Sequence, residues 1–175
     1  MPETFGSAFL GGLGHPVIGM DHLVAVLLVG FLSFVVTRRL MEPALFVLAS
    51  LAGCLARVWF GGLPGIECAI ALTLPVMLFM MWFHRGLAAR SGLVMLIGGS
   101  LHGYAYGDAI VGVGSSQLFA YLLGLTLVQA FLAYGFGALS GLLAEKSPKG
   151  FATLENMLSA VASGTALVFL VTSLR

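Results

Sequence analysis

Six side chains able to bind metal ions or protons lie inside or beside long apolar stretches of this sequence: His15, Asp21, His22, Glu67, His102 and Asp108. Three of them are imidazoles and three are carboxylates. Imidazole suits a borderline divalent cation such as nickel, cobalt or zinc, whereas calcium and magnesium prefer shells made of oxygen alone. These six residues are therefore candidate ligands of a transition-metal ion.

The composition indicates whether these residues lie in a water-soluble protein or in a membrane protein. Of 175 residues, 59% are hydrophobic, and only 8 are basic and 7 acidic; the mean hydropathy is +1.06. A soluble domain has about 25% charged residues, and a net charge of +1 offers no field for a polyanion. These values exclude a soluble enzyme, a nucleic-acid-binding protein and a disordered tail. They indicate a polytopic membrane protein, in which buried ionisable groups are costly and usually functional.

We expect an all-α membrane bundle of about six spanning helices, with residues 1–175 forming one domain. The apolar stretches that predict these helices are residues 17–36, 43–60, 64–83, 92–110, 117–140 and 152–174. Pro16 precedes the first stretch, where a helix tolerates a missing N–H, and residues 145–149 form the most charged loop. Residues 5–13 are apolar but too short to span, which predicts a re-entrant or interfacial segment.

The basic residues are distributed unevenly between alternate loops. The first, third and fifth loops contain Arg38, Arg39, Arg85, Arg90, Lys146 and Lys149. Because positive loops stay in the cytoplasm, we expect these loops to be cytoplasmic and both termini to lie outside. The expected location is a bacterial-type inner or plasma membrane.

In this orientation the candidate ligands would lie at similar depths in the membrane. Asp21 and His22 would lie about one turn, roughly 6–8 Å, below the outer surface, with Glu67 at a similar depth. The fourth helix would run outward, so that His102 lies about 9 Å deeper than Asp108. Three helices would then contribute donors in the outer half of the bundle.

Simpler roles exist for several of these side chains. Arg57 and Glu67 flank a short outer loop and could form an ion pair there. Asp108 could be an ordinary loop acid, and His102 could hydrogen-bond to a neighbouring helix. Asp21 and His22 have the weakest simple explanation, since an adjacent acid and imidazole inside lipid require compensation.

Glycine recurs at four-residue spacing in two of the predicted helices. Gly99, Gly103 and Gly107 share one face, and Gly137 and Gly141 share another. Small residues at this spacing let helix backbones approach closely in lipid. We therefore expect the fourth helix to be central, and the glycine faces are candidate contacts for a second copy of the chain in a homo-oligomer.

Two segments resemble the signatures of the HupE/UreJ family of nickel and cobalt permeases. The segment from His15 to His22 is similar to the family pattern H-x5-D-H, and the segment from Leu101 to Asp108 is similar to F-H-G-x-A-H-G-x-E. Residues 63–67 also resemble the start of the family's third helix. By resemblance, His15, Asp21, His22 and His102 would recognise the metal, and the chain would carry Ni²⁺ or Co²⁺ (Zn²⁺ is an alternative) as substrate, with no prosthetic group.

The second segment departs from the family pattern at three positions. Leu101 stands for a phenylalanine and Tyr106 for a second histidine, and Asp108, one position before the pattern's glutamate, is taken as the counterpart of that glutamate. The loss of one imidazole affects metal preference most directly, because it removes a nitrogen ligand.

The leading functional hypothesis is thus a non-enzymatic secondary transporter that moves a divalent metal ion into the cytoplasm. The chain has no P-loop motif, so it supplies no ATP hydrolysis of its own. A channel or small-solute facilitator is the alternative, in which the polar residues only hold the bundle together. A rhomboid-like serine protease using Ser100 is a further alternative, which the absence of histidine from the last two predicted helices disfavours.

Overall fold

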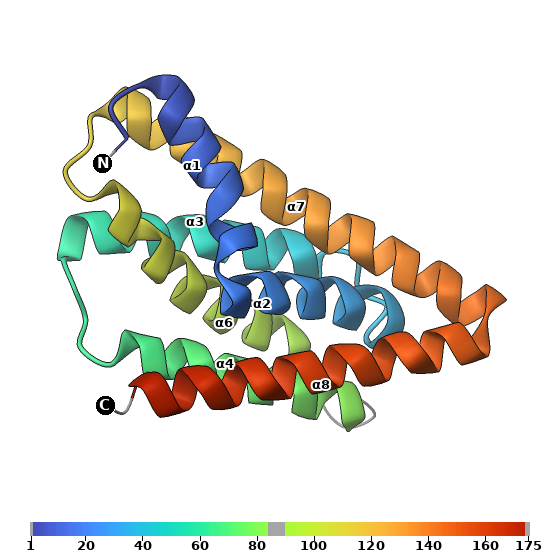
Figure 1. Cartoon of the computed structure of the whole chain (residues 1–175). Helices are drawn as coiled ribbons and strands as arrows, with labels where there is room; N and C mark the ends of the chain where they lie inside the picture. The colour runs from blue at the N-terminus through green and yellow to red at the C-terminus, as the bar shows by residue number, and fades with distance from the viewer. Residues whose placement is uncertain (1, 84–89, 174–175) are drawn as a thin grey trace.

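The computed structural model describes residues 2–83 and 90–173, and all regular secondary structure within those ranges is helical, which confirms the predicted all-α class. The helices are α1 (Phe5–Ile18), α2 (Met20–Phe31), the π-helix η1 (Leu32–Val36), α3 (Glu42–Phe60), α4 (Ile66–Trp82), α6 (Ser91–Tyr106), the 3-10 helix η3 (Gly107–Ile110), α7 (Ser115–Lys146) and α8 (Pro148–Ser173). In Figure 1, α2 lies inside the bundle, with α7 along one side and α8 along the opposite side.

Within the described ranges, three helices are long and apolar enough to cross a membrane, namely α3, α7 and α8. The bent pair of α1 with α2–η1 counts as a fourth if it forms one span. Helix α4 has 17 residues and α6 has 16, less than the roughly 20 residues that a straight span requires. The predicted count of six spans is therefore not confirmed.

The predicted helix over residues 17–36 is wrong at its start. Pro16 lies inside α1, and the chain breaks at Gly19, where the α1 axis and the α2–η1 axis differ by 79°. Gly19 is extended (φ −76°, ψ 108°), donates its N–H to the His15 carbonyl and accepts from the N–H of Leu23. A Cβ at Gly19 would lie 2.8 Å from Cδ2 of His22, so glycine permits this close approach.

Helix α7 also differs from its prediction, because it continues past residue 140 to Lys146. Residues 142–144 are good helix formers that carry the helix through Gly141. Only Ser147 separates α7 from α8, so the predicted charged loop at 145–149 is a sharp helix-to-helix turn.

Helices α3 and α6 pack backbone to backbone. A Cβ added at Gly99, Gly103 or Gly107 would overlap backbone carbonyl oxygens of α3, and one at Gly53 would overlap the Ser100 carbonyl of α6. This confirms the predicted close-packing face on the fourth helix. The second predicted face is half right, since Gly137 packs against Phe34 and the Gly30 carbonyl while Gly141 has open space around it.

The bundle has two ends with different chemistry. Figure 1 shows the connection from η1 to α3 and the α7–α8 turn at one end, and the connection from α3 to α4 and the start of α7 at the other. At the first end the buried Glu42 accepts hydrogen bonds from Thr37 at 2.7 Å and from Ser91. Arg38, Arg39, Lys146 and Lys149 lie near this end by sequence, whereas Arg85 lies outside the described residues.

Candidate metal site

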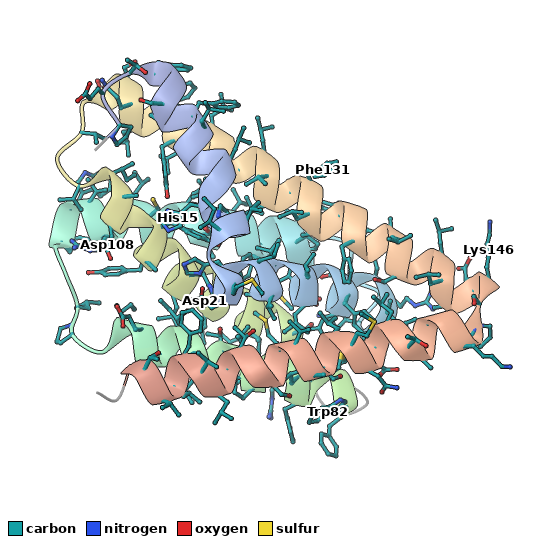
Figure 2. All side chains as sticks on the ribbon, in the orientation of Figure 1. His15, Asp21, Trp82, Asp108, Phe131 and Lys146 are labelled. Carbon is teal, nitrogen blue, oxygen red and sulfur yellow. The ribbon has the colours of Figure 1, made fainter. Side chains whose placement is uncertain are left out.

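The bend at Gly19 brings His15 and His22 together. His15 lies in the last turn of α1, and Asp21 and His22 lie in the first turn of α2. The His15 and His22 ring centroids are 5.8 Å apart, with the rings tilted by 57°. Figure 2 shows His15 and Asp21 at this junction, with Asp108 closer to the end of the bundle where η3 lies. The bend thus places the imidazole at the end of α1 beside the imidazole at the start of α2.

A third helix, α6, contributes an imidazole to the same place. His22 Nδ1 and His102 Nδ1 are 2.8 Å apart and share a hydrogen bond. His102 is 0% exposed, and His22 and Asp21 are each 6% exposed. The Asp21 carboxylate lies 3.6 Å from His22 Nδ1. Asp21, His22 and His102 therefore form a buried group whose donors come from α2 and α6, with His15 at its edge.

Two hydroxyl groups hold the outer imidazole nitrogens of this group. Thr73 Oγ1 on α4 lies 2.9 Å from His102 Nε2, and Tyr121 Oη on α7 lies 2.7 Å from His15 Nδ1. Both Thr73 and Tyr121 are buried. Neither residue could be predicted from the sequence, because a threonine or tyrosine in an apolar helix carries no spacing signal of its own.

The Tyr106 ring lies against two of the imidazoles, His15 and His22. Its ring centroid lies 4.4 Å from that of His22 and 5.2 Å from that of His15. The side chain is fully buried, so this departure from the family pattern lies within the site. Among the described residues, the fully buried side-chain oxygens without a hydrogen bond are Tyr106 Oη and Gln129 Oε1.

Asp108 and Glu67 lie apart from the buried donors. Asp108 forms an ion pair with Arg57 of α3, with Nε and Oδ1 2.5 Å apart, and its side chain is 57% exposed. The alternative pair of Arg57 with Glu67 is therefore wrong. Glu67 is exposed in the first turn of α4, where the helix dipole favours an acid.

A cavity of about 290 Å³ lies beside His15, between α1, η3 and α7. The residues lining it include His15, Gly19, Ala109 and Tyr121. The cavity gives a small solute access to His15 from the side of the bundle where α1 meets α7. It is mostly apolar elsewhere, so His15 is the first imidazole that a metal ion in the cavity would encounter.

The described residues contain no group of three or more His, Cys, Asp or Glu side chains spaced to hold a metal ion. The six predicted ligands are thus not assembled into a finished site in this conformation. Two imidazole nitrogens on one ion at about 2.1 Å each would lie roughly 3.0–3.4 Å apart. The separation of the two Nδ1 atoms at 2.8 Å is close to this value, so a small opening of the pair would admit an ion.

Comparison with known proteins covers nearly the whole chain. A family model described as HupE / UreJ protein matches residues 2–169. Protein HupE of Rhizobium leguminosarum bv. viciae is 27% identical over 134 residues, which cover 74% of this chain and 70% of that protein. No solved structure gives a significant match. The family match includes both imidazole-bearing segments, residues 15–22 and 101–108.

Proposed function

Because the chain belongs to the HupE/UreJ family of membrane proteins related to nickel and cobalt transport, we propose that it is a permease for a divalent transition-metal ion. Ni²⁺ or Co²⁺ is the proposed substrate, with Zn²⁺ as the alternative, because all three bind imidazole nitrogen. The protein is an integral membrane protein and the ion is its cargo.

The observation that carries this proposal is the buried pair of His22 and His102. Two imidazole nitrogens from different helices face each other at 2.8 Å in surroundings that exclude water. Lipid-buried imidazoles beside a carboxylate are expensive to maintain and usually lie on an ion path. A purely structural hydrogen bond between helices requires neither an acid nor a third imidazole beside it.

We propose a route from the cavity to the buried pair. His15 receives the ion as it loses water, and Asp21, His22 and His102 then bind it. Since the ligands must be deprotonated to bind a metal, release of the ion can be linked to proton uptake. Helix α6, together with the closely packed α3, then moves to open the other end of the bundle.

The direction of transport follows from the proposed orientation. The loops with Arg38, Arg39, Lys146 and Lys149 are placed in the cytoplasm by the positive-inside rule, in a bacterial-type inner or plasma membrane. The His15 cavity then lies in the outer half of the bundle, and the ion moves from there into the cytoplasm. Homo-oligomer formation through glycine faces stays a prediction, since the Gly99–Gly103–Gly107 face packs on α3 of the same chain.

Replacement of Asp21 by asparagine tests the proposal. The change keeps the shape of the side chain but removes the negative charge beside His22, so we expect uptake of Ni²⁺ or Co²⁺ to fall by about 10-fold or more. The measurement is metal uptake into proteoliposomes that contain equal amounts of folded wild-type and variant protein.

Asp108→Asn is the matched control for this experiment. Asp108 forms an exposed ion pair with Arg57. Such pairs contribute about 0–1 kcal/mol to stability, so metal uptake by this variant is expected to stay within about fivefold of wild type. Equal uptake by Asp21→Asn and the wild type would overturn the proposed site. A larger loss of uptake in Asp108→Asn than in Asp21→Asn would indicate that the metal binds near Asp108, beyond the end of α6.

The same assay separates the alternative functions. A channel or small-solute facilitator predicts flux that does not discriminate between Ni²⁺ and Mg²⁺ and does not depend on His22. For a serine protease, His102 would need a free nitrogen facing Ser100, yet its two ring nitrogens contact His22 and Thr73.

A further inference from the structure

Two buried hydroxyl groups make the same pair of contacts on opposite sides of the imidazole group. Thr73 Oγ1 is 2.7 Å from the Ile70 carbonyl oxygen and 2.9 Å from His102 Nε2. Tyr121 Oη is 3.0 Å from the Tyr106 carbonyl oxygen and 2.7 Å from His15 Nδ1. In each case one hydroxyl lies between a backbone carbonyl and one imidazole nitrogen.

The proton count links the direction of these hydrogen bonds to the tautomer of each ring. A hydroxyl has one proton to donate, and a carbonyl oxygen can only accept. When the Thr73 and Tyr121 hydroxyls donate to the carbonyls, each presents a lone pair to its imidazole. The facing ring nitrogens, His102 Nε2 and His15 Nδ1, must then carry the protons.

We propose that Thr73 and Tyr121 are positioning residues that fix the tautomers of His102 and His15 for metal binding. In the neutral rings, the proton on one nitrogen leaves the other nitrogen with a lone pair. His102 therefore offers Nδ1, and His15 offers Nε2. This inference deepens the proposed function and rests on it for the identity of the ligand as a metal ion.

The His102 tautomer also accounts for its contact with His22. A bare Nδ1 on His102 accepts the hydrogen bond of 2.8 Å from His22 Nδ1. An ion that takes this lone pair replaces the His22 N–H group there, and the His22 ring stays neutral when that proton moves to its own Nε2. With the opposite tautomer, Nδ1–H of His102 would point at the ion and the ring would have to turn away from Thr73 before binding.

Burial makes these anchors effective. Thr73 is 7% exposed, Tyr121 is 1% exposed and His102 is 0% exposed, so bulk water does not compete for the ring N–H group of His102. Partners that hold the second nitrogen of a metal-binding histidine fix its tautomer and orientation, and their loss typically costs about 10–100-fold in affinity. We expect an effect of this size from each anchor.

The test compares three variants of the full-length protein in detergent micelles. Thr73→Val and Tyr121→Phe remove one hydroxyl each with little change of shape, whereas Thr73→Ser keeps the hydroxyl and removes only the methyl group. Co²⁺ affinity is measured by titration of the visible absorption of the bound ion. Thr73→Val and Tyr121→Phe should bind Co²⁺ about 10–100-fold more weakly, whereas Thr73→Ser should bind nearly as the wild type does.

Two matched controls remove hydroxyls that donate to carbonyls without touching a histidine. Thr126 donates to the Leu122 carbonyl and Tyr134 donates to the Leu40 carbonyl. Thr126→Val and Tyr134→Phe should leave Co²⁺ affinity unchanged. Wild-type affinity in both Thr73→Val and Tyr121→Phe, or an equal loss in the controls, would overturn the inference.

A second measurement keeps the inference separate from the proposed function. In metal-free wild-type protein labelled with ¹⁵N-histidine, NMR reports which ring nitrogen of each histidine is protonated. Protonated Nε2 on His102 and protonated Nδ1 on His15 support the inference, and the opposite tautomers overturn it. If the wild type binds neither Ni²⁺ nor Co²⁺, the proposed function fails, while the tautomers still decide whether Thr73 and Tyr121 set them.

Discussion

Replacing His102 with alanine is expected to abolish metal binding and to reduce uptake by at least about 100-fold, more than the loss of an outer partner costs. His102 is the only histidine on α6 and supplies the nitrogen that faces His22 at 2.8 Å. Without it the described residues offer no second buried imidazole from another helix to pair with His22. The measurement is Co²⁺ titration of the purified variant together with Ni²⁺ uptake into proteoliposomes.

Ser100→Ala is the control for this variant. Ser100 lies on the same helix, two residues from His102, and belongs to none of the contacts of the imidazole group. It should bind Co²⁺ and transport Ni²⁺ as the wild type does. Wild-type uptake by His102→Ala would contradict the proposed site, and a selective loss in Ser100→Ala would instead favour chemistry at the serine.

Replacing Gly103 with alanine is expected to give the largest loss of stability among the glycine substitutions. A Cβ at this position would overlap the Ser50 carbonyl and Cα of α3. Backbone atoms cannot rotate away as a side chain can, so α3 and α6 would have to separate. Overpacking of this kind costs about 1–3 kcal/mol or more. Thermal unfolding in detergent measures the effect.

The same substitution should also weaken metal binding. Gly103 follows His102 directly, and separation of α6 from α3 shifts the His102 ring away from His22 and Thr73. Co²⁺ affinity is therefore expected to fall together with stability, and wild-type affinity in a destabilised variant would show that the site tolerates movement of α6.

Gly141→Ala is the matched control on α7. No atom lies within 4 Å of a Cβ at this position, and alanine favours the helix over glycine by about 1 kcal/mol. This variant should be as stable as the wild type or slightly more stable. If Gly103→Ala unfolds at the same temperature as Gly141→Ala, the close packing of α3 on α6 does not limit stability.

The sequence predicted much of the helical architecture through apolar runs and their interruptions. The helices at α3, α4 and α6–η3 lie within two residues of their predicted bounds, because each run ends at glycine, proline or charge. The break at Gly19 was missed, since residues 17–36 are continuously apolar and a single glycine does not stop a helix by itself. The bend depends on the packing of α1 against α7.

The candidate site was also predicted only in part from the sequence. Metal-binding side chains stand out in an apolar chain, so His15, Asp21, His22 and His102 could be selected from type and spacing alone. Glu67 and Asp108 were selected on equal grounds, yet Asp108 pairs with Arg57 and Glu67 is exposed. Depth along a helix does not specify which way a side chain points, and only the packing of α3 on α6 directs Asp108 to Arg57.

Residue types and their distribution by themselves determined that this chain is an all-helical membrane protein with imidazole and carboxylate groups inside its apolar segments, and the resemblance of two of those segments to HupE/UreJ signatures indicated the family. The tertiary structure alone decided that His22 meets His102, that Thr73 and Tyr121 hold the outer nitrogens, and that Asp108 is bound elsewhere. The physical reason is that hydrogen-bond partners arise from contacts between distant segments, and a hydroxyl in an apolar helix looks the same in sequence whether or not a histidine faces it.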